Sequence, residues 1–455
     1  MSTHPPGPRG LPVVGNSNQY ARDPFRFLES TAAAYGDVIR FDLGPVETYM
    51  ITNPRDIERV LVSEDARYRK PDFQDAAFDG LLGDGLLMSE GELWHTQRQL
   101  AQPSFAPDRI GGLAAPIWAH ADAMVEGWDD GTVIDAQLSM ARVTVQIIVE
   151  AMFGTTLDET QVTTIQENLE PLGQRFEPDP LRFLLPDWAP TPENREYNRS
   201  LETLEGLLDE IVTSRRGTVR DPSVDAAGTA DELPMDLVSI LLRAAERGEQ
   251  SDEQLRDELM TMLLAGHDTT ALTLTYFWYL LSEHPDIEAQ LIEEIDATVG
   301  TGRPTLEAVR EVELLDRVLN EAMRLYPPVY IMFREPVTDV RLGGYRIPRG
   351  AAVLLPQWVV HRSSRWYDAP ERFDPDRWRR ERRAARPRFA FFPFGGGPRH
   401  CIGKHLSLVE AKLIITRVLQ EYRLSYTGDG PFELRGSLTM HPDRPLPMRV
   451  ERRSG

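Results

Sequence analysis

The feature that most limits what this chain can fold into is its only cysteine, Cys401, which stands in a glycine-rich loop. Three glycines at positions 395–397 precede it, Gly403 follows it, and an amphipathic stretch with Leu406 and Leu413 begins directly afterwards. A helix N-terminus carries free N–H groups and a partial positive charge, which lower a cysteine pKa and stabilise the thiolate. Glycines let the backbone pass close to sulfur and donate to it. A lone cysteine is most often an inert buried residue, but the glycines on both sides predict a functional thiolate.

The composition excludes several classes of protein and site. One cysteine cannot form an intramolecular disulfide, nor a zinc or iron–sulfur site that needs several cysteines. Residues 1–16 contain no signal-peptide pattern and no apolar span, so we expect a cytoplasmic protein without a membrane anchor. The formal net charge of -21 argues against nucleic-acid and anionic-membrane partners, because phosphate contacts need a basic surface.

The positive charge is almost wholly arginine, because Lys70, Lys404 and Lys412 are the only lysines beside 71 acidic residues. This composition resembles that of halophilic proteins, whose salt-rich cytoplasm screens the repulsion between like charges. A GC-rich genome is the alternative explanation of the arginine bias, and it stays open.

The hydrophobic pattern predicts a mainly α protein with small β sheets, folded as a single domain over residues 1–455. We expect a β-rich part over about 1–70, with a hairpin at 37–52, a helical part over about 71–325, and a mixed part over about 326–455. Two stretches rich in loop-forming residues, 178–192 and 217–231, interrupt the helical pattern.

The longest predicted helix begins after Ser251, an N-cap residue with Gln254 three positions later, and continues until Pro285. At 1.5 Å per residue it is about 50 Å long, enough to cross the molecule. Its polar residues, among them Glu258 and His267, make a membrane span a poor interpretation. We therefore expect a buried central helix.

The run from Phe394 to Gly403 resembles the signature of the cytochrome P450 family, and every specified position is filled. The resemblance implies that Cys401 is the proximal ligand of haem iron, that Phe394 packs on the thiolate side and that Arg399 binds a haem propionate. Thiolate ligation favours O–O cleavage at the iron. It also implies the fold of that family, with haem b between the long central helix and the helix after the cysteine.

Within the long helix, Ala265 to Thr270 resembles the oxygen-activation motif of the same family. Gly266 would let a flat ligand approach the backbone, while the Thr269 hydroxyl bonds the Ala265 carbonyl and opens the helix locally. Asp268 and Thr269 would then relay protons to bound oxygen. In isolation an ordinary helical core is the better interpretation of this motif, and the cysteine loop reverses that preference. His267 occupies a variable position and is expected to be packed.

Glu321 and Arg324 lie three apart on a predicted helix, so they share a face. Such pairs usually lie on the surface and contribute little. The segment containing Arg372 resembles a second arginine-bearing segment of the family, which implies a buried structural triad of Glu321, Arg324 and Arg372. Its role would be folding and haem retention.

Further residues are assigned to the haem propionates by resemblance. Trp94 and Arg98 lie four apart on a helix that resembles the propionate-binding helix of the family, and His95 is a weaker candidate. Arg334 matches another propionate arginine, so that three arginines in all would face the two carboxylates. Each of them, taken alone, fits a solvated surface arginine equally well.

Seven arginines and a single acid occupy positions 377–388, from Arg377 to Arg388, in an otherwise acidic chain. In the fold implied by the resemblance this segment faces the proximal surface, so it is a candidate docking site for an acidic, ferredoxin-type electron donor. A solvated loop is the equally weighted alternative.

We therefore expect a monomeric haem-thiolate monooxygenase that inserts one atom of O2 into an apolar substrate, such as a fatty acid, terpenoid or sterol-like molecule. Three alternatives remain: a peroxygenase driven by hydrogen peroxide, a haem-thiolate isomerase or dehydratase, and a non-catalytic haem sensor. The Asp268 and Thr269 pair argues against the first two, which need no proton delivery to O2. The chain has no spare length for the partner domain of a sensor.

Overall fold

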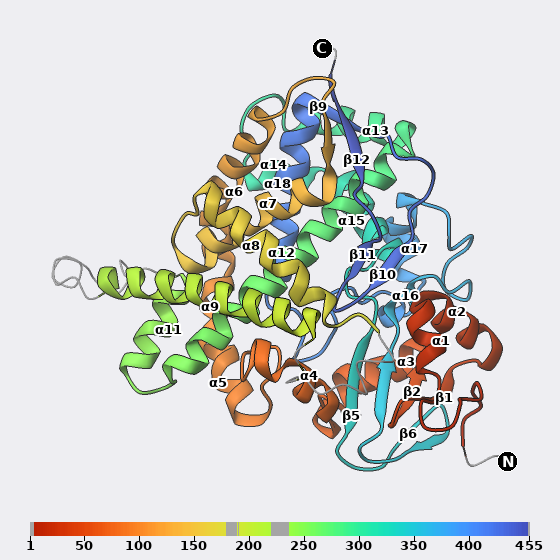
Figure 1. Ribbon diagram of the computed structural model, residues 1–455. Coiled ribbons are helices and arrows are strands. Elements are labelled where there is room, and N and C mark those ends of the chain that lie inside the picture. Colours follow the sequence, from red (N-terminus) through yellow and green to blue (C-terminus); the bar gives the residue numbers. More distant parts are fainter. Residues whose placement is uncertain (1–3, 179–188, 190, 220–235, 454–455) are drawn as a thin grey trace.

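The computed structural model describes residues 4–178, 189, 191–219 and 236–453. In this part of the chain the structure is mainly helical with four small sheets, as predicted. Figure 1 shows the helices gathered around the central helix α12, with the N-terminal strands and β5 together at one corner. The predicted interruptions at 178–192 and 217–231 lie largely outside the described residues.

The largest sheet combines the two ends of the chain. The predicted hairpin is present as β1 (Val38–Leu43) and β2 (Val46–Ile51), which pair antiparallel and turn at Gly44 with a φ of 57°. Strand β2 then pairs in parallel with β8 (Ala352–Leu355), and the sheet order is β1-β2-β8-β5-β3. The sheet therefore joins strands from the N-terminal and the C-terminal parts of the chain. The other two strands are β5 (Met332–Pro336) and β3 (Tyr68–Arg69).

Three smaller sheets complete the β structure of the described residues. The run from Val340 to Ile347 is a hairpin, because Gly343 and Gly344 both have positive φ angles and form its turn. The strands of these sheets are β6 (Val340–Leu342) with β7 (Tyr345–Ile347), β10 (Leu434–Gly436) with β11 (Met440–Pro442), and β4 (Val133–Asp135), β12 (Pro447–Arg452) and β9 (Tyr422–Tyr426).

Helices make up the rest of the architecture. Those before the central helix are α1 (Ser17–Arg22), α2 (Pro24–Tyr35), α3 (Pro54–Glu58), α4 (Asp72–Leu82), α5 (Gly91–Ala101), α6 (Pro107–Glu126), α7 (Ala136–Ile148), α8 (Glu159–Gln174), α9 (Pro192–Val219) and α11 (Leu237–Glu246). Those after it are α13 (Pro285–Thr298), α14 (Leu306–Glu311), α15 (Glu313–Leu325), α16 (Gln357–His361), α17 (Arg380–Ala384) and α18 (Lys404–Glu421). Short single turns are η1 (Arg59–Ser63), η2 (Asp65–Arg67), η3 (Gln102–Phe105), η4 (Val149–Phe153), η7 (Pro375–Trp378) and η8 (Arg388–Ala390).

The central helix α12 (Asp252–Ser282) begins as predicted. The Ser251 hydroxyl accepts from the Gln254 N–H at 3.1 Å, and the Gln254 side chain accepts from the Ser251 N–H at 2.9 Å, which forms a capping box. The helix is buried along most of its length and packs on α7 and α18. It therefore carries its central residues into the interior, where α18 brings the cysteine loop.

Candidate active site

The cysteine loop is a tight turn that only glycine can make at its centre. Gly397 has a φ of 68°, and a Cβ added there would lie 1.7 Å from the Leu61 carbonyl oxygen. The Cys401 N–H donates to the Phe394 carbonyl at 3.0 Å, which closes the loop. At Gly403, by contrast, an added Cβ would make only ordinary contacts with Phe105 and with the Cys401 sulfur. The protein's own atoms thus require glycine at position 397 and leave room at 403.

The helix N-terminus does not by itself keep Cys401 ionised. Burial raises the pKa of the thiol, although the N–H groups of Gly403 and Lys404 and the charge of Arg98 act in the opposite direction. The expected net lowering of this pKa was therefore wrong, because the cost of burying a charge outweighs the helix. The thiol is nevertheless exposed by surface area. The thiol therefore has protein on several sides and still keeps surface that a ligand can reach. A metal cation bound there would deprotonate the thiol.

The α12 motif reaches the helix of the cysteine loop. The Thr270 hydroxyl donates to the Ser407 hydroxyl of α18 at 3.0 Å. The Thr269 hydroxyl donates to the Ala265 carbonyl at 3.0 Å, as predicted, but the helix is continuous through this turn, so the expected local opening is not seen. Ala265 is exposed although α12 is central, and it therefore faces open space in the interior.

Two other residues of the motif are explained by packing. A Cβ on Gly266 would lie 2.7 Å from Ile148, so this glycine permits the close approach of α12 and α7. This contact gives Gly266 a role that the sequence did not suggest. His267 is buried and its Nδ1 lies 2.7 Å from the Leu263 carbonyl oxygen, as expected for a packed residue; burial lowers its pKa.

Asp268 has two partners that sequence reasoning missed. The Thr439 hydroxyl donates to its Oδ2 at 2.6 Å, and His441 Nε2 lies 3.4 Å from the same oxygen. Burial alone would raise the pKa of Asp268, but His441 and Thr439 together lower it. The carboxylate is therefore held ionised beside Thr269. No pattern in the sequence connects positions 268 and 441.

Arg334 is the clearest candidate for a haem propionate. Burial lowers its pKa to about 10, and the nearby charge of Arg399 acts in the same direction. Within the described residues no carboxylate forms an ion pair with it, and its one hydrogen bond is to the adjacent Phe333 carbonyl at 2.7 Å. By surface area Arg334 is half-buried, and a cation that loses part of its hydration without an adjacent anion is costly. This arrangement fits a ligand that carries carboxylates.

The other predicted propionate residues gather around the cysteine loop. Arg399 pairs with Glu90 at 2.6 Å and lies 4.5 Å above the Trp94 ring. Arg98 donates to the His400 carbonyl at 3.1 Å. His95 is exposed and its ring lies 4.7 Å from that of Trp94.

One thiol donor and a set of arginines thus lie around the cysteine loop, and one of these arginines has no carboxylate partner among the described residues. A haem, with a metal ion and two carboxylates, fits this donor set.

The buried triad is present, but its third member was predicted wrongly. Arg324 donates two hydrogen bonds of 2.8 Å to Glu321, and both side chains are fully buried. Arg377 supplies the second cation, with its Nε 3.2 Å from Glu321. The side chain of Arg372 is instead exposed and pairs with Asp374, so that only its backbone carbonyl faces the triad. The single turn η7 explains the exchange, because it directs Arg377 and the neighbouring Trp378 inward.

The arginine segment is therefore smaller as a surface than the sequence suggested. Arg377 is buried in the triad, and Arg386 lies 4.9 Å from the rings of both Tyr367 and Trp378. The exposed members are Arg379, Arg380, Arg382, Arg383 and Arg388.

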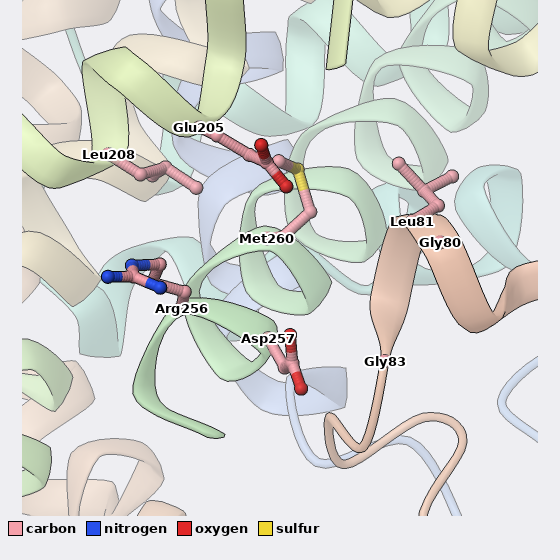
Figure 2. A pocket seen from close by; sticks show the side chains of 8 residues that line it. All are labelled: Gly80, Leu81, Gly83, Glu205, Leu208, Arg256, Asp257 and Met260. Carbon is pink, nitrogen blue, oxygen red and sulfur yellow. The ribbon is translucent and has the colours of Figure 1, made fainter. Parts of the chain in front are cut away.

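A small pocket opens between α4, α9 and the first half of α12, away from the cysteine loop. Figure 2 shows Glu205 and Leu208 of α9 facing Arg256, Asp257 and Met260 of α12. None of the predicted site residues lines it. We therefore do not assign the chemistry to this pocket. None of the described helices combines the length and apolar character that crossing a membrane requires.

Comparisons with known proteins agree with this geometry. The sequence model of the family described as Cytochrome P450 matches residues 5–446. The chain is 32% identical to pentalenene oxygenase of Streptomyces avermitilis, over 98% of this chain and 97% of the relative. It is 31% identical to cyclooctat-9-en-7-ol 5-monooxygenase of Streptomyces melanosporofaciens, over 92% and 88% of the two chains. The crystal structure of the cytochrome P450DA heme domain superposes with a TM-score of 0.86 at 27% identity, covering 99% of this chain and 98% of the other.

The family match spans almost the whole chain, and the exposed thiol of Cys401 with the nearby arginines suits the cofactor of that family. This chain therefore belongs to the cytochrome P450 family of monooxygenases, which bind haem b through a cysteine thiolate.

Proposed function

We propose that this cytochrome P450 inserts one oxygen atom from O2 into an apolar, terpenoid-like substrate, with Cys401 as the iron ligand. The observation that carries the proposal is the bond between Thr270 and Ser407, which ties the helix turn of Asp268 and Thr269 to the helix that follows Cys401. Pentalenene and cyclooctat-9-en-7-ol, the compounds in the names of two relatives, are terpenoids, and they favour this class over fatty acids and sterols.

The residues around the cysteine loop would hold the cofactor, and those of the α12 motif would transfer protons. A thiolate-ligated haem, when bound, supplies the activation of dioxygen. Arg334, Arg98 and Arg399 would hold its propionates, with Trp94 packed beneath Arg399 and His95 beside it. Phe394 and Gly403 frame Cys401. Asp268, kept ionised, would accept a proton from outside and pass it to the Thr269 hydroxyl, which lies one residue further along the open side of α12.

Of the alternative functions, the peroxygenase and the isomerase have no use for this proton route. The Asp268 carboxylate accepts a 2.6 Å hydrogen bond and faces a histidine, an arrangement that positions an acid. The proposal of an O2-dependent monooxygenase rests on that arrangement together with the motif.

Thr269→Val is expected to lower product formation by about 10²-fold, because it removes the hydroxyl that passes the proton. Consumed electrons should then appear as hydrogen peroxide. Thr275→Val is the matched control, since Thr275 makes the same type of bond, 2.7 Å to the Ala271 carbonyl, in the buried part of the same helix. The measurement is the amount of product and of hydrogen peroxide formed per electron pair taken from the external electron donor. Wild-type product yield in Thr269→Val would contradict the role.

We further propose that a ferredoxin-type donor docks on the exposed arginines of positions 379–388. Reversing Arg380 and Arg383 to Glu should slow reduction of the haem about tenfold at low salt and flatten its salt dependence, because long-range attraction accelerates encounter. A double reversal of Arg195 and Arg199, which are exposed on α9, is the control. Stopped-flow reduction with a ferredoxin measures the rate. Equal rates in both double variants would rule out docking at this surface.

The composition supports a salt-rich cytoplasm as the place of action. In that case the free energy of unfolding should rise with KCl concentration up to molar salt, and a flat or falling dependence would favour the GC-rich genome instead.

A further inference from the structure

We infer that His441 is a positioning residue that reprotonates Asp268 through the hydroxyl of Thr439. The inference rests on the proposed function, because it completes the route that Asp268 and Thr269 begin. His441 lies on β11, and Thr439 lies in the turn between β10 and β11; this hairpin lies against α12.

The hydrogen bonds of the three residues form a directed chain. Thr439 Oγ1 lies 2.6 Å from Asp268 Oδ2 and 2.8 Å from His441 Nε2. A carboxylate only accepts, so the hydroxyl must donate to Asp268 and accept from the histidine. His441 therefore presents an Nε2–H to the hydroxyl, and a single proton can move along the chain without any side chain changing place.

The hairpin that carries the chain is fixed on both sides. The Met440 carbonyl accepts from the Tyr276 hydroxyl of α12 at 2.7 Å, and the Met440 N–H donates to the Pro328 carbonyl at 2.8 Å. The side-chain amide of Gln137, at the start of α7, lies 3.0 Å from His441 Nδ1. The amide can turn so that its oxygen accepts from Nδ1–H, which the ring carries both in the charged state and after it has given away its Nε2 proton. The ring is thus held in place in both protonation states.

The charges around His441 favour its protonated form. Burial would lower its pKa, but Asp268 raises it, and the net shift is upward from 6.5. Arg435, directly opposite on β10, acts to lower the pKa, while Glu170 of α8 acts to raise it. On the side of Asp268 the remaining titratable neighbours are His267 and Tyr276.

The sign of the pH dependence follows from this upward shift. The charged pair is complete below the pKa of His441 and is lost as the pH rises through that value.

The transfer step balances as one proton. In the charged state the Nε2–H bond of His441 breaks and the proton joins Thr439 Oγ1, while the proton of that hydroxyl passes to Asp268 Oδ2. His441 is left neutral with its proton on Nδ1, and Asp268 is protonated for Thr269. The His441 side chain is 21% exposed, so solvent can return the proton to it.

The test combines a direct titration with turnover. NMR titration of the imidazoles is done in the diamagnetic ferrous carbon monoxide form, with His441→Gln to assign the signal. The pKa of His441 should lie above 6.5 and fall by about one unit or more in Asp268→Asn.

In turnover, the rate of product formation by the wild-type protein should fall as the pH rises through the measured pKa of His441. His441→Gln and Thr439→Val should each abolish this alkaline limb of the pH–rate profile, slow product formation about tenfold and raise peroxide release. Thr439→Ser keeps the hydroxyl and should behave like the wild-type protein.

His120→Gln is the matched control, because His120 of α6 forms a comparable 2.6 Å pair with Glu150 of η4 and has no hydrogen bond to Asp268, Thr439 or His441. It should leave the limb unchanged. If His441→Gln or Thr439→Val kept the alkaline limb, or if the pKa of His441 did not respond to Asp268→Asn, the relay would be refuted while the monooxygenase proposal stood. If the wild-type protein with haem oxidised no substrate in an O2-dependent way, the proposed function would fail, and the titration would still decide whether the pair exists.

Discussion

Cys401→Ala is expected to abolish the red-shifted Soret band that carbon monoxide produces with the reduced protein, and to abolish substrate oxidation. The chain has no second cysteine that could replace the ligand. Burial raises the pKa of the thiol, which is exposed by surface area, and a bound metal cation would favour its thiolate form. The measurement is the absorbance spectrum of the reduced protein with carbon monoxide minus that of the reduced protein without it, which reports the ligand of the iron. The haem content of the purified protein is measured as well.

The control for this experiment is His405→Ala. His405 is exposed and lies four residues after Cys401, close enough to test whether a neighbouring imidazole binds the iron instead. It should keep the full band. A thiolate-type band in Cys401→Ala, or its loss in His405→Ala, would contradict the assignment of Cys401.

Arg377→Ala is expected to lower the free energy of unfolding by about 3–5 kcal/mol, because it leaves Glu321 buried beside a single cation. Arg377 also donates to the carbonyls of Asp368, Ala369 and Arg372, and the variant loses all three of these hydrogen bonds. Ala369 then keeps only the Arg372 N–H as a donor, and Arg372 keeps only Arg324. Urea unfolding of the haem-loaded protein, followed by circular dichroism and by Soret absorbance, measures the loss. We expect haem release to accompany unfolding.

Arg372→Ala is the matched comparison for this variant. Its side chain is exposed and pairs only at the surface with Asp374, so the expected change is within about 0.5 kcal/mol. The backbone carbonyl that faces Arg324 is retained in the variant. A larger loss in Arg372→Ala than in Arg377→Ala would show that the triad uses Arg372 after all.

The sequence predicted those parts of the fold that depend on local chemistry. The capping box at Ser251, the hairpin around Gly44 and the bond from Thr269 to Ala265 all involve residues within a few positions of each other. Short-range rules suffice for such features. The turn of the cysteine loop at Gly397 belongs to the same class, because its φ of 68° favours glycine locally. The close approach of the Leu61 carbonyl to this glycine is instead a contact between distant segments.

The incorrect and missing predictions depend on contacts between distant segments. Arg372 and Arg377 lie five residues apart, and the direction of η7 decides which of them is buried. Thr439 lies 171 residues after Asp268 and His441 lies two residues further on, and the hairpin that carries both brings them to Asp268. The pKa of Cys401 depends on how much protein surrounds it, which no local pattern reports.

The parallel pairing of β2 with β8 has a consequence for synthesis on the ribosome. Thr48 lies opposite Ala352, so the free edge of the first hairpin emerges about 300 residues before the strand that completes it. At roughly 5–20 residues per second this interval lasts about 15–60 s. During that time an unpaired strand edge is a template for pairing with another chain. Nascent copies on one polysome are therefore at risk of joining through residues 46–51, and a chaperone that covers this segment would protect the yield of folded enzyme.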